Sequence, residues 1–226
     1  MDERTTKPQA MITFPAGLIV PFLIVQLILL AWSAFPAVTM KTIQPLESWV
    51  FLAGGQVLFI SWVWPIMGHR FAGQPRGQIV LEAVLLLAAA APGALASVLW
   101  TDATRETILA AGLYFLAWLG AGGLAAAARP AVRWAFGLLS TIANFGLIGL
   151  GYLWMDFLYC DPLAVWRVWR FSPMCQASRL AESGWSILST TEDRLACLLP
   201  VAVLVVLAII SLLTPRARQD QSAAIP

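Results

Sequence analysis

Residues 83–100 read AVLLLAAAAPGALASVLW. A helix built from this stretch is apolar on every face, and the polar–apolar alternation of a half-buried strand is absent. About 20 apolar residues in a helix cross the hydrocarbon core of a bilayer. In lipid every backbone N–H and C=O group needs a partner, and a helix supplies those partners within one segment. The stretch therefore predicts a transmembrane helix.

Five further stretches of the chain have the same character. The first of them is longer than the core of a secretory signal, so we expect it to be retained as a helix. The sequence predicts an all-α fold, a polytopic bundle of six transmembrane helices that forms a single domain over residues 1–226. The predicted spans are approximately 14–35, 48–68, 78–100, 106–128, 132–155 and 195–213. The fourth span follows the loop TDATRE, residues 101–106, in which Thr101 or Asp102 is the predicted helix cap.

The composition agrees with a membrane protein and excludes several functional classes. Of the 226 residues, 60% are hydrophobic and 12% are charged, whereas soluble domains carry roughly 25% charged residues. The net charge of +2 does not indicate a nucleic-acid partner. His69 is the one histidine, and we expect neither a metal site nor a cofactor. Because HExxH, GxSxG and P-loop motifs are absent, we expect no enzyme activity, and any ATP hydrolysis would belong to a separate subunit.

Basic residues in the short loops predict the orientation, because cytoplasmic loops carry an excess of Lys and Arg. One side of the predicted bundle holds eight such residues, and the short loops on the other side hold two. We therefore expect a multi-pass protein of the inner (cytoplasmic) membrane, with both termini in the cytoplasm. The first set is Arg4, Lys7, Arg70, Arg76, Arg129, Arg133, Arg216 and Arg218, and the second set is Lys41 and Arg105.

The outer loop between the fifth and sixth spans, residues 156–194, is predicted to contain short interfacial helices. Ser172 followed by Pro173 is typical of a helix start, because serine caps a helix and proline suits its first turn. Apolar residues then recur at helical spacing on one face, which predicts an amphipathic helix on the outer leaflet. Two roles remain open for these pieces, a cap on the bundle and a gate on an exit path. The apolar face is Ala177, Leu180, Ala181, Gly184 and Leu188.

Cys160 and Cys175 both lie in this outer loop. If the outer side is an oxidising periplasm, they are candidates for a disulfide that joins the two helical pieces. Spacing along the chain does not establish the geometry that a disulfide requires, so free thiols are the alternative.

Few polar side chains fall inside the predicted spans. Apart from Glu106 at the first position of the fourth span, Glu82 is the one acid there, and intramembrane acids are often functional. It also lies one turn into its helix, where a carboxylate suits the helix dipole and Arg70 or Arg76 is a candidate partner. The other polar side chains are candidates for a substrate path, although such groups more often hold helices together. The path candidates are Gln26, Gln56 and Asn144.

The arrangement resembles the membrane subunit of ABC-2-type exporters in topology and in short motifs. Those permeases have six helices with both ends inside, a cytoplasmic turn between helices two and three, and short helices in an outer loop between helices five and six. The matching residues are Pro65, then Arg70 with Phe71, Gly77, and Leu81 with Glu82, and in the outer loop Ser172, Pro173 and Arg179.

The resemblance implies a permease-like subunit that works with a separate ATP-binding cassette subunit in the lipid bilayer. Two copies, or one copy and a related partner, would enclose a path lined by helices one, two and five. The ATPase would dock on the turn at residues 69–78, and the outer helices would gate release. The implied docking residues are His69, Arg70, Phe71, Arg76 and Glu82, and the implied gate residues are Ser172, Pro173, Arg179 and Glu182.

Two other functional classes fit the sequence. The chain could be a non-transporting structural or assembly subunit of a larger membrane complex, since polar groups are scarce and small residues offer smooth surfaces for packing. It could also be an intramembrane enzyme that uses Glu82 and His69. The small residues include Gly120, Gly122, Gly123, Gly146, Gly149 and Gly151.

Overall fold

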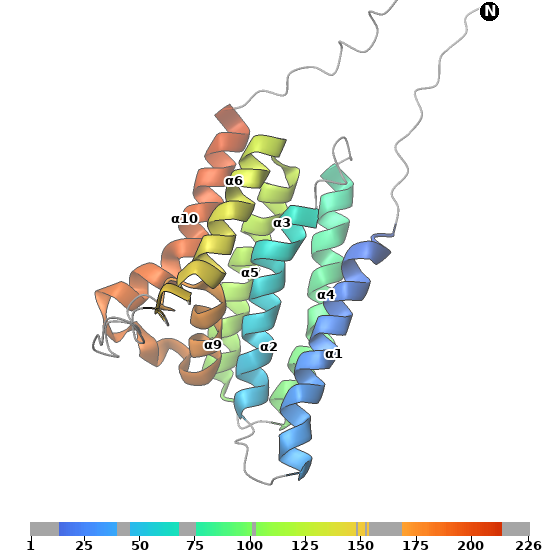
Figure 1. Cartoon of the computed structure of the whole chain (residues 1–226), viewed down its shortest axis with the longest axis vertical. Helices are drawn as coiled ribbons and strands as arrows, with labels where there is room; N and C mark the ends of the chain where they lie inside the picture. The colour runs from blue at the N-terminus through green and yellow to red at the C-terminus, as the bar shows by residue number, and fades with distance from the viewer. Residues whose placement is uncertain are drawn as a thin grey trace, which may run out of the picture.

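The fold is known from a computed structural model that describes residues 14–39, 46–67, 76–100, 103–147, 149–151, 153 and 169–213. Every regular element in these ranges is a helix. Figure 1 shows the long helices side by side, with the start of α1 and the end of α10 at the same end of the bundle. The elements are α1 (Ala16–Thr39), α2 (Leu46–Leu58), η1 (Phe59–Val63), α3 (Trp64–Met67), α4 (Arg76–Trp100), α5 (Arg105–Ala127), α6 (Pro130–Thr141), η3 (Ile142–Gly146), α9 (Pro173–Ser183), η4 (Gly184–Ser189) and α10 (Thr191–Leu213).

The all-α prediction is confirmed, and the described part of each of the six predicted spans is mostly helical. Within the described residues, five helical stretches are long and apolar enough to cross a membrane, and α1 adds a shorter apolar stretch at Ala16–Ala31. The five are Trp49–Met67, Gly77–Ala96, Arg105–Ala127, Pro130–Gly151 and Thr191–Ser211.

The second helix is continuous from α2 through η1 to α3, but its hydrogen-bond pattern changes at η1. There the N–H of Trp64 donates to the carbonyl of Phe59, five residues back, which is the π-helical pattern. Pro65 follows directly, and proline has no N–H to donate. The π-helical turn therefore lies where the regular ladder is interrupted. The fifth helix has a second π-helical turn, η3, in which the N–H of Leu147 donates to the carbonyl of Ile142.

The cap predicted for the fourth span was wrong by one helical turn. Thr104 is the cap, and its hydroxyl oxygen accepts the backbone N–H of Thr107 at 3.3 Å. The helix begins at Arg105. Thr101 and Asp102, which the sequence predicted as caps, lie outside the described residues. Several capping residues follow one another here, and the sequence alone does not select among them.

The core of the bundle forms around α5, which packs against α2, α4, α6, α9 and α10. Trp64 is fully buried and lies against Gly122 and Gly123 of α5. A Cβ atom at Gly122 would lie 2.6 Å from the carbonyl oxygen of Ile60, which belongs to the backbone of η1. Glycine therefore allows the π-helical turn to approach α5 closely, as predicted for the small residues of this helix.

The amphipathic helix predicted after Ser172 is confirmed as α9, which lies on the flank of the bundle against α2 and α5 (Figure 1). Its buried residues include Ala177, Leu180 and Ala181, as predicted. The helix ends earlier than predicted, because Gly184 adopts a positive φ of 58° and the chain continues in the 3₁₀ turn η4. The apolar face of α9 rests on other helices, and its position relative to the outer leaflet stays a prediction.

Candidate functional site

The two π-helical turns face each other through a group of small polar side chains. Ser140 of α6 donates its hydroxyl to the carbonyl oxygen of Ser61 in η1 at 2.7 Å. This is the carbonyl that Pro65, four residues further on, cannot serve. Asn144 of η3 donates its side-chain N–H to the Ser61 hydroxyl at 3.3 Å and to the Ser140 carbonyl at 3.0 Å. All three polar residues are buried.

The same group reaches the start of α9. The side-chain oxygen of Asn144 accepts the backbone N–H of Met174 at 3.1 Å. Ser172 caps α9 by accepting the N–H of Cys175 at 3.4 Å, so two of the first free N–H groups of the helix have partners. We call Ser61, Ser140, Asn144 and the N–H of Met174 the Asn144 cluster. It joins the second helix, the fifth helix and α9 at one buried point.

A second group holds α9 against the start of α10. Arg179 of α9 forms an ion pair with Asp193 at 2.8 Å. Arg170 lies 3.6 Å from the same carboxylate and 2.8 Å from Glu192. Thr190 donates its hydroxyl to the Asp193 carboxylate at 2.6 Å and accepts the Asp193 N–H at 3.2 Å, so it caps the start of α10. We call Arg170, Arg179, Glu192 and Asp193 the Asp193 cluster.

The predicted gate residues contribute differently to these two groups. Ser172 and Pro173 start α9 as predicted, and Arg179 belongs to the Asp193 cluster.

Glu182 lies one turn beyond Arg179 and lines a cavity of about 600 Å³ between α1, α2 and α9. The remaining wall of this cavity is largely apolar, for example Leu29 and Leu58. We call it the α9 cavity. Arg179 and Glu182 place two opposite charges on the α9 side of the cavity, and mainly apolar side chains line its α1 and α2 sides.

Burial raises the pKa of the Cys175 thiol, and the Ser172 hydroxyl and the Arg179 charge oppose this change only in part. The thiol is therefore largely protonated at neutral pH, which slows its reaction with electrophiles. Cys160 lies outside the described residues, so its disulfide with Cys175 stays a prediction.

The predicted path residues Gln26 and Gln56 lie together, but away from Asn144. Gln56 donates to the Gln26 side-chain oxygen at 3.1 Å and to the carbonyl of Ala90 at 3.3 Å. Gln26 donates to the carbonyl of Ala89 at 3.1 Å. These carbonyls belong to the turn of α4 just before Pro92, where a proline disturbs the helical ladder. Both side-chain amides therefore link helices, which is the more common role of such polar groups inside a bundle.

Glu82 is buried on α4 and is held by neutral donors. It accepts the indole N–H of Trp64 at 3.1 Å and the Gln78 side-chain N–H at 3.3 Å. The other docking candidates His69, Arg70 and Phe71 lie outside the described residues. Arg76 is described only as the first residue of α4, so the predicted Arg partner of Glu82 stays a prediction.

Several participants in these groups were not predicted. The Ser61 carbonyl is free to accept Ser140 because Pro65 has no N–H, and the Ser61 hydroxyl accepts Asn144; the π-helical turn that places both groups is not visible in the sequence. Asp193 was not selected because acids in the first helical turn are common at caps. A proline four residues after a small polar residue was the one available signal for Ser61.

The described polar residues form contacts between helices, and they do not form a catalytic constellation. No group of three or more His, Cys, Asp or Glu side chains that could hold a metal ion occurs among the described residues. The described polar groups hold helices together and line the edge of the α9 cavity. No protein family, curated protein or solved structure matches this chain.

Proposed function

We propose that this chain is a permease-like membrane subunit of an ABC-2-type export system that works with a separate ATPase subunit. In this proposal six helices cross the inner membrane, and both termini face the cytoplasm. The proposal is carried by one observation, the Asn144 cluster, in which two π-helical turns and the start of α9 share a single hydrogen-bonded point.

The geometry of the cluster suits a moving part. π-Helical turns lack the regular hydrogen-bond ladder and often occur at functional sites. The second helix runs without a break from the cluster to Met67, directly before the proposed docking turn at 69–78. A push on that turn is expected to shift η1 against η3. Because Asn144 also holds the N–H of Met174, the shift reaches α9.

The α9 cavity is the part of the proposed path that this movement would change. Met174, which bonds to Asn144, is also one of its lining residues. Arg179 and Glu182 line the same cavity, in keeping with the gate role inferred from the sequence. The largely apolar wall favours a cargo with both a polar and a hydrocarbon part.

Co-purification tests the proposal most directly. The tagged full chain is isolated from its host in mild detergent, and its partners are quantified by mass spectrometry. We expect an ATP-binding subunit in stoichiometric amount. Arg70→Ala in the proposed docking turn should reduce recovery of that subunit, whereas Lys41→Ala in a predicted outer loop should not. Recovery of an intact complex that contains no nucleotide-binding subunit would overturn the proposal.

A non-transporting structural or assembly subunit is the second candidate. It is favoured by Gln26, Gln56 and Asn144, whose side-chain N–H groups all donate to oxygen atoms within the bundle. Such bonds fit a scaffold as well as a path. The same isolation separates the candidates, because a scaffold should bring other membrane subunits in fixed ratio without an ATPase.

A further inference from the structure

The α9 cavity lies along α2, which is packed between α1 and α9 (Figure 1). Gly54 and Gly55 are neighbours on α2, and both line the cavity. An added Cβ atom at Gly54 would lie 2.5 Å from the Ser178 hydroxyl oxygen of α9, and one at Gly55 would overlap Leu29 of α1. The two glycines therefore let both neighbouring helices approach α2 closely. The α1 side of the cavity is apolar, whereas the α9 side carries the charged residues.

The charged side chains lie toward one end of the cavity. The start of α9 is held at η1 by the Asn144 cluster. Further along α9, Ser178 donates its hydroxyl to the carbonyl oxygen of Val50, near the start of α2. The two helices therefore run in opposite directions. Glu182 follows Ser178 by one turn of α9, so it lies at the end of the cavity that is formed by the first turns of α2.

This charged end coincides with one end of a membrane-spanning stretch. The apolar stretch of the second helix begins at Trp49, and its lining of the cavity extends from Phe51 to Val63. Twelve residues of helix span about 18 Å, which is more than half of the roughly 30 Å hydrocarbon core of a bilayer. In a bilayer, a molecule in this cavity would have its polar end at the membrane boundary and its hydrocarbon part inside.

The two charges at this end are not equivalent. Arg179 pairs at 2.8 Å with Asp193, whose side chain is 3% exposed and does not line the cavity. Arg170, the other arginine beside Asp193, pairs with Glu192. These two arginines and two acids balance each other. Glu182 is the one acid in the described lining, it is exposed, and it forms no ion pair within the described part of the chain. The cavity therefore carries one uncompensated negative charge.

Aromatic rings line the cavity along α2 and at the start of α9. The face of an aromatic ring attracts cations, and its apolar surface packs against hydrocarbon. An uncompensated carboxylate at the polar end and aromatic rings further along together favour a ligand that has a positive charge and a hydrocarbon part. The rings belong to Phe51, Phe59, Trp62 and Trp169.

We propose that the α9 cavity binds a cationic amphiphile, a molecule with one amine or quaternary ammonium group and one hydrocarbon chain. The cationic group lies at Glu182, and the chain extends along α2 toward Trp62. This assignment deepens the proposed export function by naming the class of its cargo. It rests on that function only for transport, because binding in the cavity needs no ATPase.

Photo-crosslinking of the full chain in nanodiscs, without any ATPase, tests the proposal. Three probes share one alkyl chain with a diazirine and differ in the head group, which is trimethylammonium, hydroxyl or sulfonate. Mass spectrometry maps the label, which is normalised to the exposed face of α10. We expect the trimethylammonium probe to label the cavity residues of α1 and α2 about five- to tenfold more than the hydroxyl probe. Equal labelling by the three probes, or a preference for the sulfonate, would overturn the proposal.

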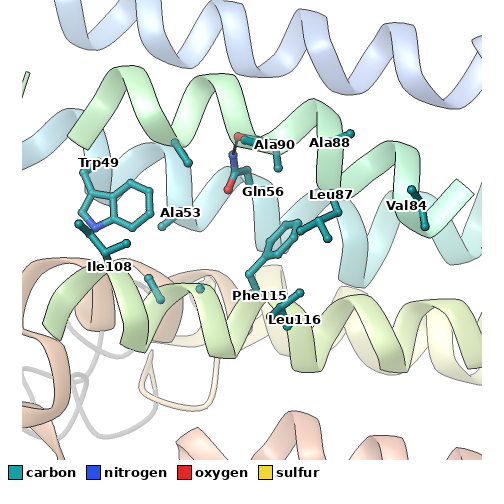
Figure 2. A pocket seen from close by; sticks show the side chains of 14 residues that line it. Trp49, Ala53, Gln56, Val84, Leu87, Ala88, Ala90, Ile108, Phe115 and Leu116 are labelled. Carbon is teal, nitrogen blue, oxygen red and sulfur yellow. Dashed lines mark hydrogen bonds between the residues drawn. The ribbon is translucent and has the colours of Figure 1, made fainter. Parts of the chain in front are cut away.

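A second cavity provides a comparison within the same molecule. It has a volume of about 490 Å³ and lies between α2, α4 and α5 (Figure 2). Its described lining contains no charged residue, and the side-chain N–H of Gln56 is bonded to the carbonyl of Ala90. Label there should not depend on the charge of the head group. A preference of the same size in both cavities would come from the membrane rather than from Glu182, and would contradict the proposal.

Glu182→Gln tests the contact with the cationic group at an exposed position, where the fold should tolerate the change. It should reduce labelling by the trimethylammonium probe to the level of the hydroxyl probe. Glu192→Gln removes the same charge outside the cavity and should preserve the preference. An unchanged preference in Glu182→Gln, or an equal loss in both variants, would overturn the role of Glu182. Because no ATPase is present, these outcomes are independent of the co-purification that tests the export function.

Val25→Phe tests whether the hydrocarbon chain lies in the cavity. It enlarges a lining residue of α1 and should lower labelling of the cavity by all three probes. Val20→Phe makes the same change at an exposed position of α1 that does not line the cavity, and it should leave the label unchanged. Circular dichroism checks that both variants are folded. Full labelling in a folded Val25→Phe chain would place the probe outside the cavity and overturn the proposal.

Discussion

The Asn144 cluster and the Asp193 cluster both hold α9, but with opposite chemistry. At the start of α9, neutral side chains and backbone groups form the contacts, and Ser61, Ser140 and Asn144 are buried. Further along α9, Arg179 pairs with Asp193, and the surrounding arginine and glutamate side chains reach the surface. The side chains of Arg179 and Glu192 are 25% and 48% exposed.

The difference follows from the cost of placing charge in an apolar medium. A charged side chain inside a membrane is expensive, whereas small polar groups can bond across helices at moderate gain. Where the side chains of the Asp193 cluster reach the surface, water screens the arginines and keeps each ion pair modest. The buried cluster is therefore suited to setting the geometry of α9, and the charged cluster to a contact that can open and close.

The largest effect is expected from Gly122, which backs the π-helical turn of the Asn144 cluster. Gly122→Val would place a Cβ atom 2.6 Å from the Ile60 carbonyl oxygen and force α5 away from η1. The free energy of unfolding should fall by about 3 kcal/mol, as for an overpacked core. Titration with sodium dodecyl sulfate measures it. Gly112→Val in the same helix is the control, and equal losses in both variants would contradict the close approach of α5 to η1.

Asn144→Leu should have the next largest effect. It removes the partner of the Met174 N–H and the bonds to Ser61 and Ser140. We expect a loss of about 2 kcal/mol, since a buried backbone donor is left without a partner. Faster proteolysis near α9 should accompany the loss. Ile142→Val, at an exposed neighbour in the same turn, should change neither quantity by a comparable amount.

Asp193→Asn tests the charged cluster. It removes the negative charge shared by Arg170 and Arg179 and keeps a polar side chain beside the Thr190 cap. The expected loss is about 1 kcal/mol, because these arginines remain partly solvated. This loss should shrink in high salt, whereas that of Asn144→Leu should not. Salt-independent losses in both variants would remove the distinction between the two clusters.

The smallest effect is expected from Glu192→Gln. Its carboxylate pairs with Arg170 at 2.8 Å, but nearly half of its side chain is exposed. Exposed ion pairs contribute little, and we expect a change below about 0.5 kcal/mol. The midpoint of thermal unfolding in detergent is a sufficient measurement. A loss as large as that of Asp193→Asn would mean that the Arg170–Glu192 pair contributes as much to stability as the buried Asp193 carboxylate.

The helices were predictable because the signal for them is local. An apolar stretch such as residues 83–100 needs only its own backbone groups to satisfy its hydrogen bonds. Ser172 and Pro173 likewise mark the start of α9 through contacts within four residues. The cap at Thr104 was missed because several neighbouring residues are equally good caps, and packing selects among them.

The candidate site was predictable only in part. The sequence singled out Asn144 and Arg179, but it did not identify Ser61 or Asp193 as their partners. It also grouped Gln26, Gln56 and Asn144 into one path, whereas the structure separates the glutamine pair from the Asn144 cluster. Partners of this kind lie more than ten residues apart, and their pairing depends on how helices rotate and approach.

The sequence by itself determined that the chain is all-helical, apolar enough for a membrane, and carries an amphipathic helix after Ser172, because composition and periodicity act over short stretches. Only the tertiary structure decided that two π-helical turns face each other and that Asn144 reaches α9. These features arise where helices meet. The physical reason is that close approach, made possible by residues such as Gly122, decides which polar groups find partners and which do not.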